Sequence, residues 1–337
     1  MTPHDDLKAV TNDSDWFATI TIPTPSNLDN AQARFELEWR NARRQLSDVW
    51  AADEFEQLDE RVQGLRHGDS ASLVIVHARH GSTFVESLDE PVAATTVHEG
   101  RLPRWATVIE ARQRVIAHVV VEADRAGADL TAFDGGDVLA TKSIEGATLH
   151  LHRGHPGGWS QHRFQQRAEN TWEDNARLVA DAVTTLAQSV DAQLVAVAGD
   201  IRAQMFILES LPADIADITV RIEAGSPEGI ADEVVRLLST IVAERVTAAA
   251  ELVRAGENNN RASVDTNTIV DALRQGRVAT LLVHDDATSE HAADPTWLDG
   301  ARLVDRAIAT ALATDAEILV VPHLAVMHGP LAATLRW

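Results

Sequence analysis

The residues best suited to chemistry lie in a basic segment without acids. Residues 146–168 contain no Asp or Glu, although 51 of the 337 residues are acidic. A glycine pair followed by a tryptophan lies among arginines and histidines there. Arginine binds phosphate, and an exposed aromatic ring can stack on a base. The pattern predicts an RNA-binding loop, and the alternative is a solvated loop whose tryptophan packs on its own domain. The candidate residues are Arg153, Gly157, Gly158, Trp159, Ser160, Gln161, His162, Arg163 and Arg167.

Two further groups of residues could carry chemistry. His150, His152 and His155 could be metal ligands, since alternate residues of a strand share a face and imidazole binds zinc. No fourth protein ligand is evident nearby, so we expect no metal site. Arg79 and His80 lie in a predicted hairpin turn, where a solvated turn is the simpler interpretation and a functional contact is the alternative.

Several chemistries are excluded by what the sequence lacks. There is no cysteine, which removes disulfides, thiolate zinc sites and cysteine nucleophiles. The sequence also has no phosphate-binding Gly-x-x-x-x-Gly-Lys loop, no dinucleotide-binding Gly-x-Gly-x-x-Gly after a strand and no Gly-x-Ser-x-Gly. Asp200 follows a glycine at the end of a strand, and we expect it to cap the next helix because its carboxylate can accept hydrogen bonds from the first N–H groups. The same carboxylate would repel an anion, which argues against a phosphate site there. No cofactor is predicted.

Length and charge set the broad class. A chain of 337 residues suggests two or three domains, and we expect three, over residues 1–112, 113–256 and 257–337. No apolar run is long enough for a membrane span, and the acidic first 16 residues do not resemble a secretory signal, so a cytoplasmic protein is expected. The net charge of −22 favours RNA contacts only where acids are locally absent.

Hydrophobic spacing predicts an α/β protein with an α+β first domain. Stripes at intervals of three and four residues predict two pairing helices, one through Phe35 to Val49 and one through Phe55 to Leu65. Strands are expected at 71–76 and 83–88, joined by a hairpin. Later strands are expected at 115–121, 128–133, 138–143, 194–198, 218–222, 278–284, 318–322 and 331–337. Later helices are expected at 161–190, 203–211, 227–255, 264–273 and 297–313.

The same segment resembles a known family. Residues 157–164, GGWSQHRF, are similar to the pattern Gly-Gly-Gln-Ser, two residues, Arg-Phe of archaeal and eukaryotic class 1 release factors. Residues 270–283 and 329–337 resemble the opening and the close of that family's third domain. The resemblance covers residues 115–337 and implies the three-domain architecture of release factors and pelota. The family's stop-codon motifs need Tyr and Cys, which this chain lacks.

One departure from the family pattern bears on activity. Family release factors use the motif glutamine to place water on the peptidyl-tRNA ester, and Trp159 stands at that position. An indole donates one hydrogen bond and accepts none, so it cannot orient water as an amide does. Members without the glutamine include pelota, which acts in ribosome rescue, and the bacterial hibernation factor Balon. The bacterial branch is the closer likeness.

The resemblance implies a ribosome-binding protein that is not an enzyme. We expect a hibernation factor in the vacant A site of the 70S ribosome, touching 16S and 23S rRNA, with Arg153, Arg163 and Arg167 on phosphates. Arg79 and His80 would contact the decoding centre. Its third domain would dock a translational GTPase, elongation factor Tu, and the protein would act as a monomer. The alternatives are a pelota-like rescue factor, a peptidyl-tRNA hydrolase using Gln161, and a non-ribosomal stress adaptor.

Overall fold

The computed structural model describes residues 4–24, 31–47, 49–63, 70–124, 126–145, 158–285 and 294–337, without the side chains of 31, 63 and 158–172. Helices accompany three separate sheets, which confirms the predicted α/β class. The chain forms two compact units, one of residues 1–113 with 244–337 and one of residues 114–243. The bounds of three domains stay a prediction.

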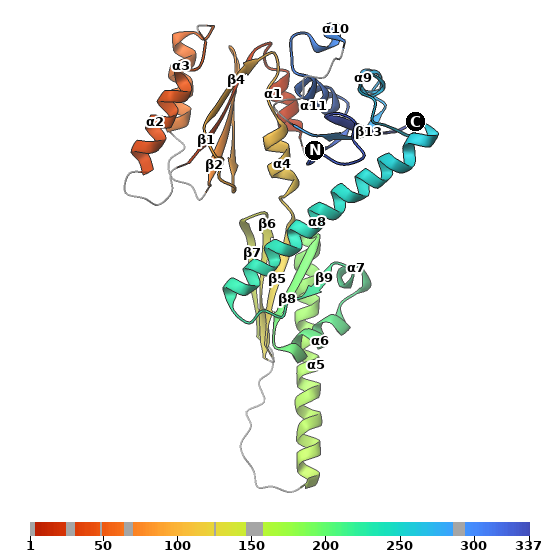
Figure 1. Cartoon of the computed structure of the whole chain (residues 1–337). Coiled ribbons are helices and arrows are strands. Elements are labelled where there is room, and N and C mark those ends of the chain that lie inside the picture. Colours follow the sequence, from red (N-terminus) through yellow and green to blue (C-terminus); the bar gives the residue numbers. More distant parts are fainter. Residues whose placement is uncertain are drawn as a thin grey trace. The chain divides into compact units, whose positions relative to one another are not determined.

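An antiparallel sheet of order β3-β2-β1-β4 forms the N-terminal part of the first unit. Two helices cover one face of it (Figure 1). The two helices pair as predicted, since Trp39 Nε1 donates to Asp59 Oδ1 at 2.8 Å. The first helix ends at Arg43, so the predicted extension to the exposed Val49 is wrong. The elements are β1 (Phe17–Pro23), α2 (Ala31–Arg43), α3 (Ala52–Gln63), β2 (Ser72–Ala78), β3 (Thr83–Leu88) and β4 (Thr96–Gly100).

The other face of this sheet shares one apolar core with the C-terminal part of the chain. Trp105, fully buried before α4 (Ala106–Gln113), lies in the same core as Ile269 and Ile308 of the C-terminal helices. α1 (Asp5–Thr11) adds Leu7 to it. Residues from the two ends of the sequence therefore stabilise each other within one unit.

The C-terminal sheet has the order β10-β13-β11-β12. α9 and α11 pack on one face, and the last turns of α8 cover the other with Ala249 and Val253. One helix over 297–313 was predicted, but Asp299 and Gly300 have φ of 48° and 76°, which ends α10. The elements are α8 (Pro227–Gly256), η1 (Glu257–Asn259), β10 (Ala262–Ser263), α9 (Thr266–Arg274), β11 (Val278–Val283), α10 (Pro295–Leu298), α11 (Leu303–Ala313), β12 (Glu317–Val320) and β13 (Leu331–Leu335).

The second unit is built on a sheet of order β7-β6-β5-β8-β9. The predicted meander is confirmed as an antiparallel β5-β6-β7, and β8 and β9 continue the sheet in parallel. α5 and α6 bury one face, and Ile230 and Val234 of α8 bury part of the other. The elements are β5 (Ala117–Ala123), β6 (Gly127–Asp134), β7 (Asp137–Glu145), α5 (Gly158–Ser189), β8 (Leu194–Gly199), α6 (Ile201–Ser210), α7 (Ala213–Ala216) and β9 (Thr219–Arg221).

Among the helices that the structure describes, none combines the length and the apolar character that a bilayer crossing requires.

Candidate functional site

The predicted RNA-binding segment falls largely outside the described residues. This holds for Arg153 and Gly157, and for the three histidines that were weighed as metal ligands. α5 begins at Gly158, three residues before its predicted start. The backbones of the remaining candidates therefore form the first turns of a helix, while their side chains lie outside the description. These residues are Trp159, Ser160, Gln161, His162, Arg163 and Arg167.

The later turns of α5 pack on its unit. Its first buried side chain among those described is Asn175, and Val179 and Val183 continue the apolar contact with the sheet. At a rise of about 1.5 Å per residue, Gly158 lies about 25 Å along the helix axis from Asn175. The ribbon of α5 extends well past the strands of its sheet at that end (Figure 1). The fold thus carries the start of α5 away from the core of the unit.

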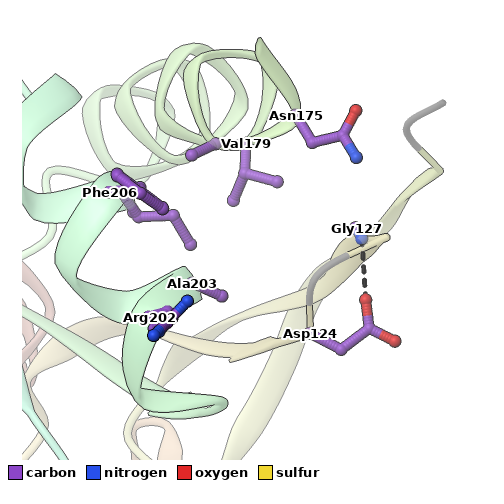
Figure 2. Close-up of a pocket in the computed structure, with 9 residues that line it drawn as sticks. Asp124, Gly127, Asn175, Val179, Arg202, Ala203 and Phe206 are labelled. Carbon is purple, nitrogen blue, oxygen red and sulfur yellow. Dashed lines mark hydrogen bonds between the residues drawn. The ribbon is translucent and has the colours of Figure 1, made fainter. Parts of the chain in front are cut away.

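A small hollow lies where α5 meets the sheet. Figure 2 shows Asn175 reaching from α5 toward the turn between β5 and β6, with Arg202 and Phe206 of α6 opposite. Asp124 closes that turn by accepting hydrogen bonds from the N–H groups of Ala126 and Gly127, at 2.6 and 2.8 Å. The other residues that line the hollow are Ala176 and Val179 of α5 and Ala203 and Ile207 of α6, so its walls are mostly apolar.

The start of α6 is held by two residues at the edge of this hollow. Gly199 has a φ of +105°, and a Cβ there would lie 2.0 Å from the carbonyl oxygen of Ala123, so only glycine fits. Asp200 accepts hydrogen bonds from the N–H groups of Arg202 and Ala203, at 3.0 and 3.2 Å. The predicted helix cap is confirmed.

The hairpin turn with Arg79 and His80 is also confirmed between β2 and β3. Arg79 Nη2 lies 3.2 Å from Asp15 Oδ1, so a neighbouring carboxylate already balances its charge. His80 has a φ of 59°, and its side chain is 72% exposed. The imidazole is accessible, although its Nδ1 lies 3.2 Å from Glu54 Oε1, and its contact with the decoding centre stays a prediction.

Sequence reasoning missed the carboxylate that fixes this turn. Glu54, buried at the start of α3, accepts hydrogen bonds from the N–H groups of His80 at 2.6 Å and Ala51 at 2.8 Å. These hydrogen bonds keep the pKa of Glu54 below its ordinary value, although burial acts in the opposite direction. The signal for it is weak, because Glu54 is one of several acids in α3 and only the fold brings the turn to it.

No resident metal site is formed by the residues that the structure describes. Nowhere among them do three or more His, Asp or Glu side chains gather so as to hold an ion. His77 is buried beneath the hairpin, and its Nδ1 lies 2.8 Å from Thr83 Oγ1. Burial lowers the pKa of this imidazole.

A known family model matches the middle of the chain, which includes most of the second unit. Residues 117–259 match the model of bacterial archaeo-eukaryotic release factor family 2. The predicted resemblance to the bacterial branch of the release factor and pelota family is confirmed. The matched residues contain the sheet, α5, α6 and α8, and they include the Gly157-Gly158-Trp159 segment.

A curated relative and several solved structures also match this chain. An uncharacterized protein of Mycobacterium tuberculosis is 27% identical over 314 residues, which cover 90% of this chain and 80% of that protein. The archaeal translation termination factor aRF1 is 17% identical, with 99% of this chain and 96% of that one covered and a TM-score of 0.27. Dom34 of S. cerevisiae, a translation termination-like factor that interacts with Hbs1, is 13% identical, with 76% and 73% covered and a TM-score of 0.42.

Proposed function

We propose that this protein is a ribosome-binding factor that occupies the vacant A site and releases no peptide. The observation that carries the proposal is Trp159, which stands at the glutamine position of the Gly-Gly-Gln motif in a unit that matches a release factor family. The protein keeps the scaffold that presents the motif but not the amide that hydrolysis by the family mechanism needs. Its activity is then occupancy, as in hibernation.

The geometry of α5 supports a role at a distant site. The helix begins at Gly158, its first buried side chain among those described is Asn175, and its ribbon extends past the strands, so the backbone of Gly158 and Trp159 lies away from the sheet (Figure 1). A group presented in this way can enter a narrow channel such as the peptidyl transferase centre while the sheet stays outside. Trp159 would stack or wedge among bases there.

The local absence of acids supports contacts between the arginines of residues 146–168 and RNA phosphates. At a net charge of −22 the whole protein is repelled by RNA, so binding requires a local surface without acids. Arg153, Arg163 and Arg167 lie in or beside the acid-free segment and would contact 23S rRNA. The N-terminal sheet with Arg79 and His80 would face the decoding centre in 16S rRNA, and the C-terminal part would dock a translational GTPase, elongation factor Tu.

Co-sedimentation with purified 70S ribosomes tests the proposal. We expect saturable binding to vacant ribosomes, strengthened by elongation factor Tu and weakened by replacing Arg153, Arg163 and Arg167 with Gln. A preference for stalled ribosomes that carry mRNA would instead support a rescue factor, and absence of binding at low salt would support a non-ribosomal adaptor.

A release assay on ribosomes loaded with peptidyl-tRNA tests the enzyme alternative. We expect no release above background from the wild type. Release that the Gln161→Ala variant abolishes would overturn the proposal and identify Gln161 as the hydrolytic residue.

A further inference from the structure

The outward face of α2 is basic in an otherwise acidic protein. Arg34, Arg40 and Arg44 lie on the side of the helix opposite to its buried residues, and all three are exposed. The helical pattern continues past Arg43, because the N–H of Arg44 donates to the carbonyl oxygen of Arg40 at 3.2 Å. The three side chains thus form one stripe about 15 Å long on the surface. Leu37 and Asn41, both exposed, lie between them.

The arginines of this stripe are available for a partner. Within the described part of the chain, the side chains of Arg34 and Arg44 have no hydrogen bond or ion pair, and the side chain of Arg40 bonds only the backbone oxygen of Glu36, at 3.2 Å. In contrast, Arg43 on the flank of the helix pairs with Asp59.

The acids of α2 lie at the two edges of the stripe. Glu38 accepts a hydrogen bond from Thr95 Oγ1 at 2.7 Å, which holds it toward the sheet. Glu36 accepts one from Gln32 Nε2 at 2.9 Å, on the flank of the helix. The face between them therefore presents positive charge with no carboxylate of its own helix on it.

From this charge and geometry we infer that the outward face of α2 binds an RNA backbone. Guanidinium groups one helical turn apart, such as those of Arg40 and Arg44, can each bind a phosphate in a bidentate manner. Asn41 supplies an amide for phosphate or ribose oxygens between them. The inference rests on the proposed function only in naming ribosomal RNA as the source of that backbone.

An RNA backbone fits this face better than a membrane does. A helix that lies on a membrane inserts a broad apolar face, but the apolar face of α2 is already buried in the domain through Trp39, Ala42 and Leu46. Only Leu37 remains outward, at 50% exposure, which is too little apolar surface for insertion.

The test compares two triple variants with the same change in charge. The test variant replaces Arg34, Arg40 and Arg44 with Gln, which preserves helix propensity. The control variant replaces Arg177, Arg236 and Arg274 with Gln, exposed helix arginines that each pair with a carboxylate. Both variants and the wild type are titrated with a fluorescent single-stranded RNA and with vacant 70S ribosomes, between 50 and 200 mM salt.

We expect the test variant to lose at least about tenfold in RNA affinity at 50 mM salt, and its salt slope to fall by about 2, since each lost phosphate contact removes about 0.7 from it. The control should bind like the wild type. Equal loss in both variants, or unchanged binding in the test variant, would overturn the inference. If the wild type binds ribosomes and the test variant binds as tightly, the inference fails while the proposed function stands.

Two further outcomes separate the inference from the proposed function. If the wild type binds the RNA through α2 but does not bind ribosomes, the proposed function fails and the inference stands. Binding to vesicles of anionic phospholipid that the test variant loses, without any binding to RNA, would assign the face to a membrane and overturn the inference.

Discussion

Replacing Asp305 with Asn should stabilise the protein at alkaline pH. Asp305 is 4% exposed, and burial raises its pKa to about 7, against the attraction of Arg302 and Arg104. Its Oδ1 atom lies 3.5 Å from Arg302 Nη1, within ion-pair range, yet neither atom has a hydrogen bond among the described residues. The carboxylate therefore bears a large cost of desolvation with incomplete compensation.

The sign follows from the raised pKa. An unfolded aspartate titrates near 3.8, so the folded state binds more protons between pH 4 and pH 7. The stabilisation from the protonated carboxyl is complete below pH 3.8 and is lost as pH rises through about 7. The loss is about 1.4 kcal/mol per pH unit and reaches about 4 kcal/mol above pH 7. Asn keeps the shape of the neutral acid and does not titrate.

Urea unfolding at pH 4 and pH 8 measures the effect. The gain in unfolding free energy of Asp305→Asn over the wild type should be below about 1 kcal/mol at pH 4 and about 4 kcal/mol at pH 8. Asp299→Asn is the control, because that carboxylate is 65% exposed and lies 3.7 Å from Arg306 Nη2. If Asp305→Asn is the less stable protein at pH 8, the ion pair with Arg302 outweighs the desolvation and the reasoning is refuted.

Three further predictions concern single residues. Gly199→Ala should destabilise the second unit by at least about 3 kcal/mol. Gly225→Ala is the control and should be neutral, because no atom lies within 4 Å of its new Cβ. Thermal unfolding measures both variants, and equal shifts in melting temperature would contradict the prediction. Glu99→Ala should lower the free energy of unfolding in urea by about 2 kcal/mol, since Ser47 and Trp50 Nε1 lose their hydrogen-bond acceptor. The control is Glu60→Ala, which removes an exposed acid. An effect of Glu99→Ala no larger than that of the control would show that these hydrogen bonds do not stabilise the protein. Trp159→Gln should raise peptide release on loaded ribosomes above the wild-type background, and an unchanged rate would mean that the motif needs more than the amide.

Periodic elements could be predicted from the sequence, and elements defined by tertiary contacts could not. α3 and α8 have clear helical stripes, and β5 to β7 are separated by glycine turns. β1 was missed because its threonines are buried beside its apolar residues, so neither face reads as polar. α4 was missed because its eight residues give too short a stripe, and the core that holds it includes residues more than 150 positions away. The division of the 297–313 helix depended on the left-handed backbone at Asp299 and Gly300.

Residue types single out the candidate segment in the sequence, and its role stays a prediction, whereas the contacts that position the hairpin turn could not be predicted. The acid-free segment stands out because composition alone reveals it, and the family match over residues 117–259 includes it. In contrast, the contact between Glu54 and the hairpin joins residues 26 positions apart, and no local pattern predicts it. The outward arginines of α2 were hidden for a different reason, because the search for an apolar stripe ignores the opposite face of the same helix.

The most direct test of the central claim is competition with tRNA on vacant 70S ribosomes. Labelled protein is bound at low salt, and tRNA directed to the A site is titrated in, with tRNA directed to the P site as the control. Occupancy of the A site predicts displacement by the A-site tRNA alone, at a concentration that rises with the amount of protein. Binding that persists at saturating A-site tRNA, or that both tRNAs displace equally, would contradict the account.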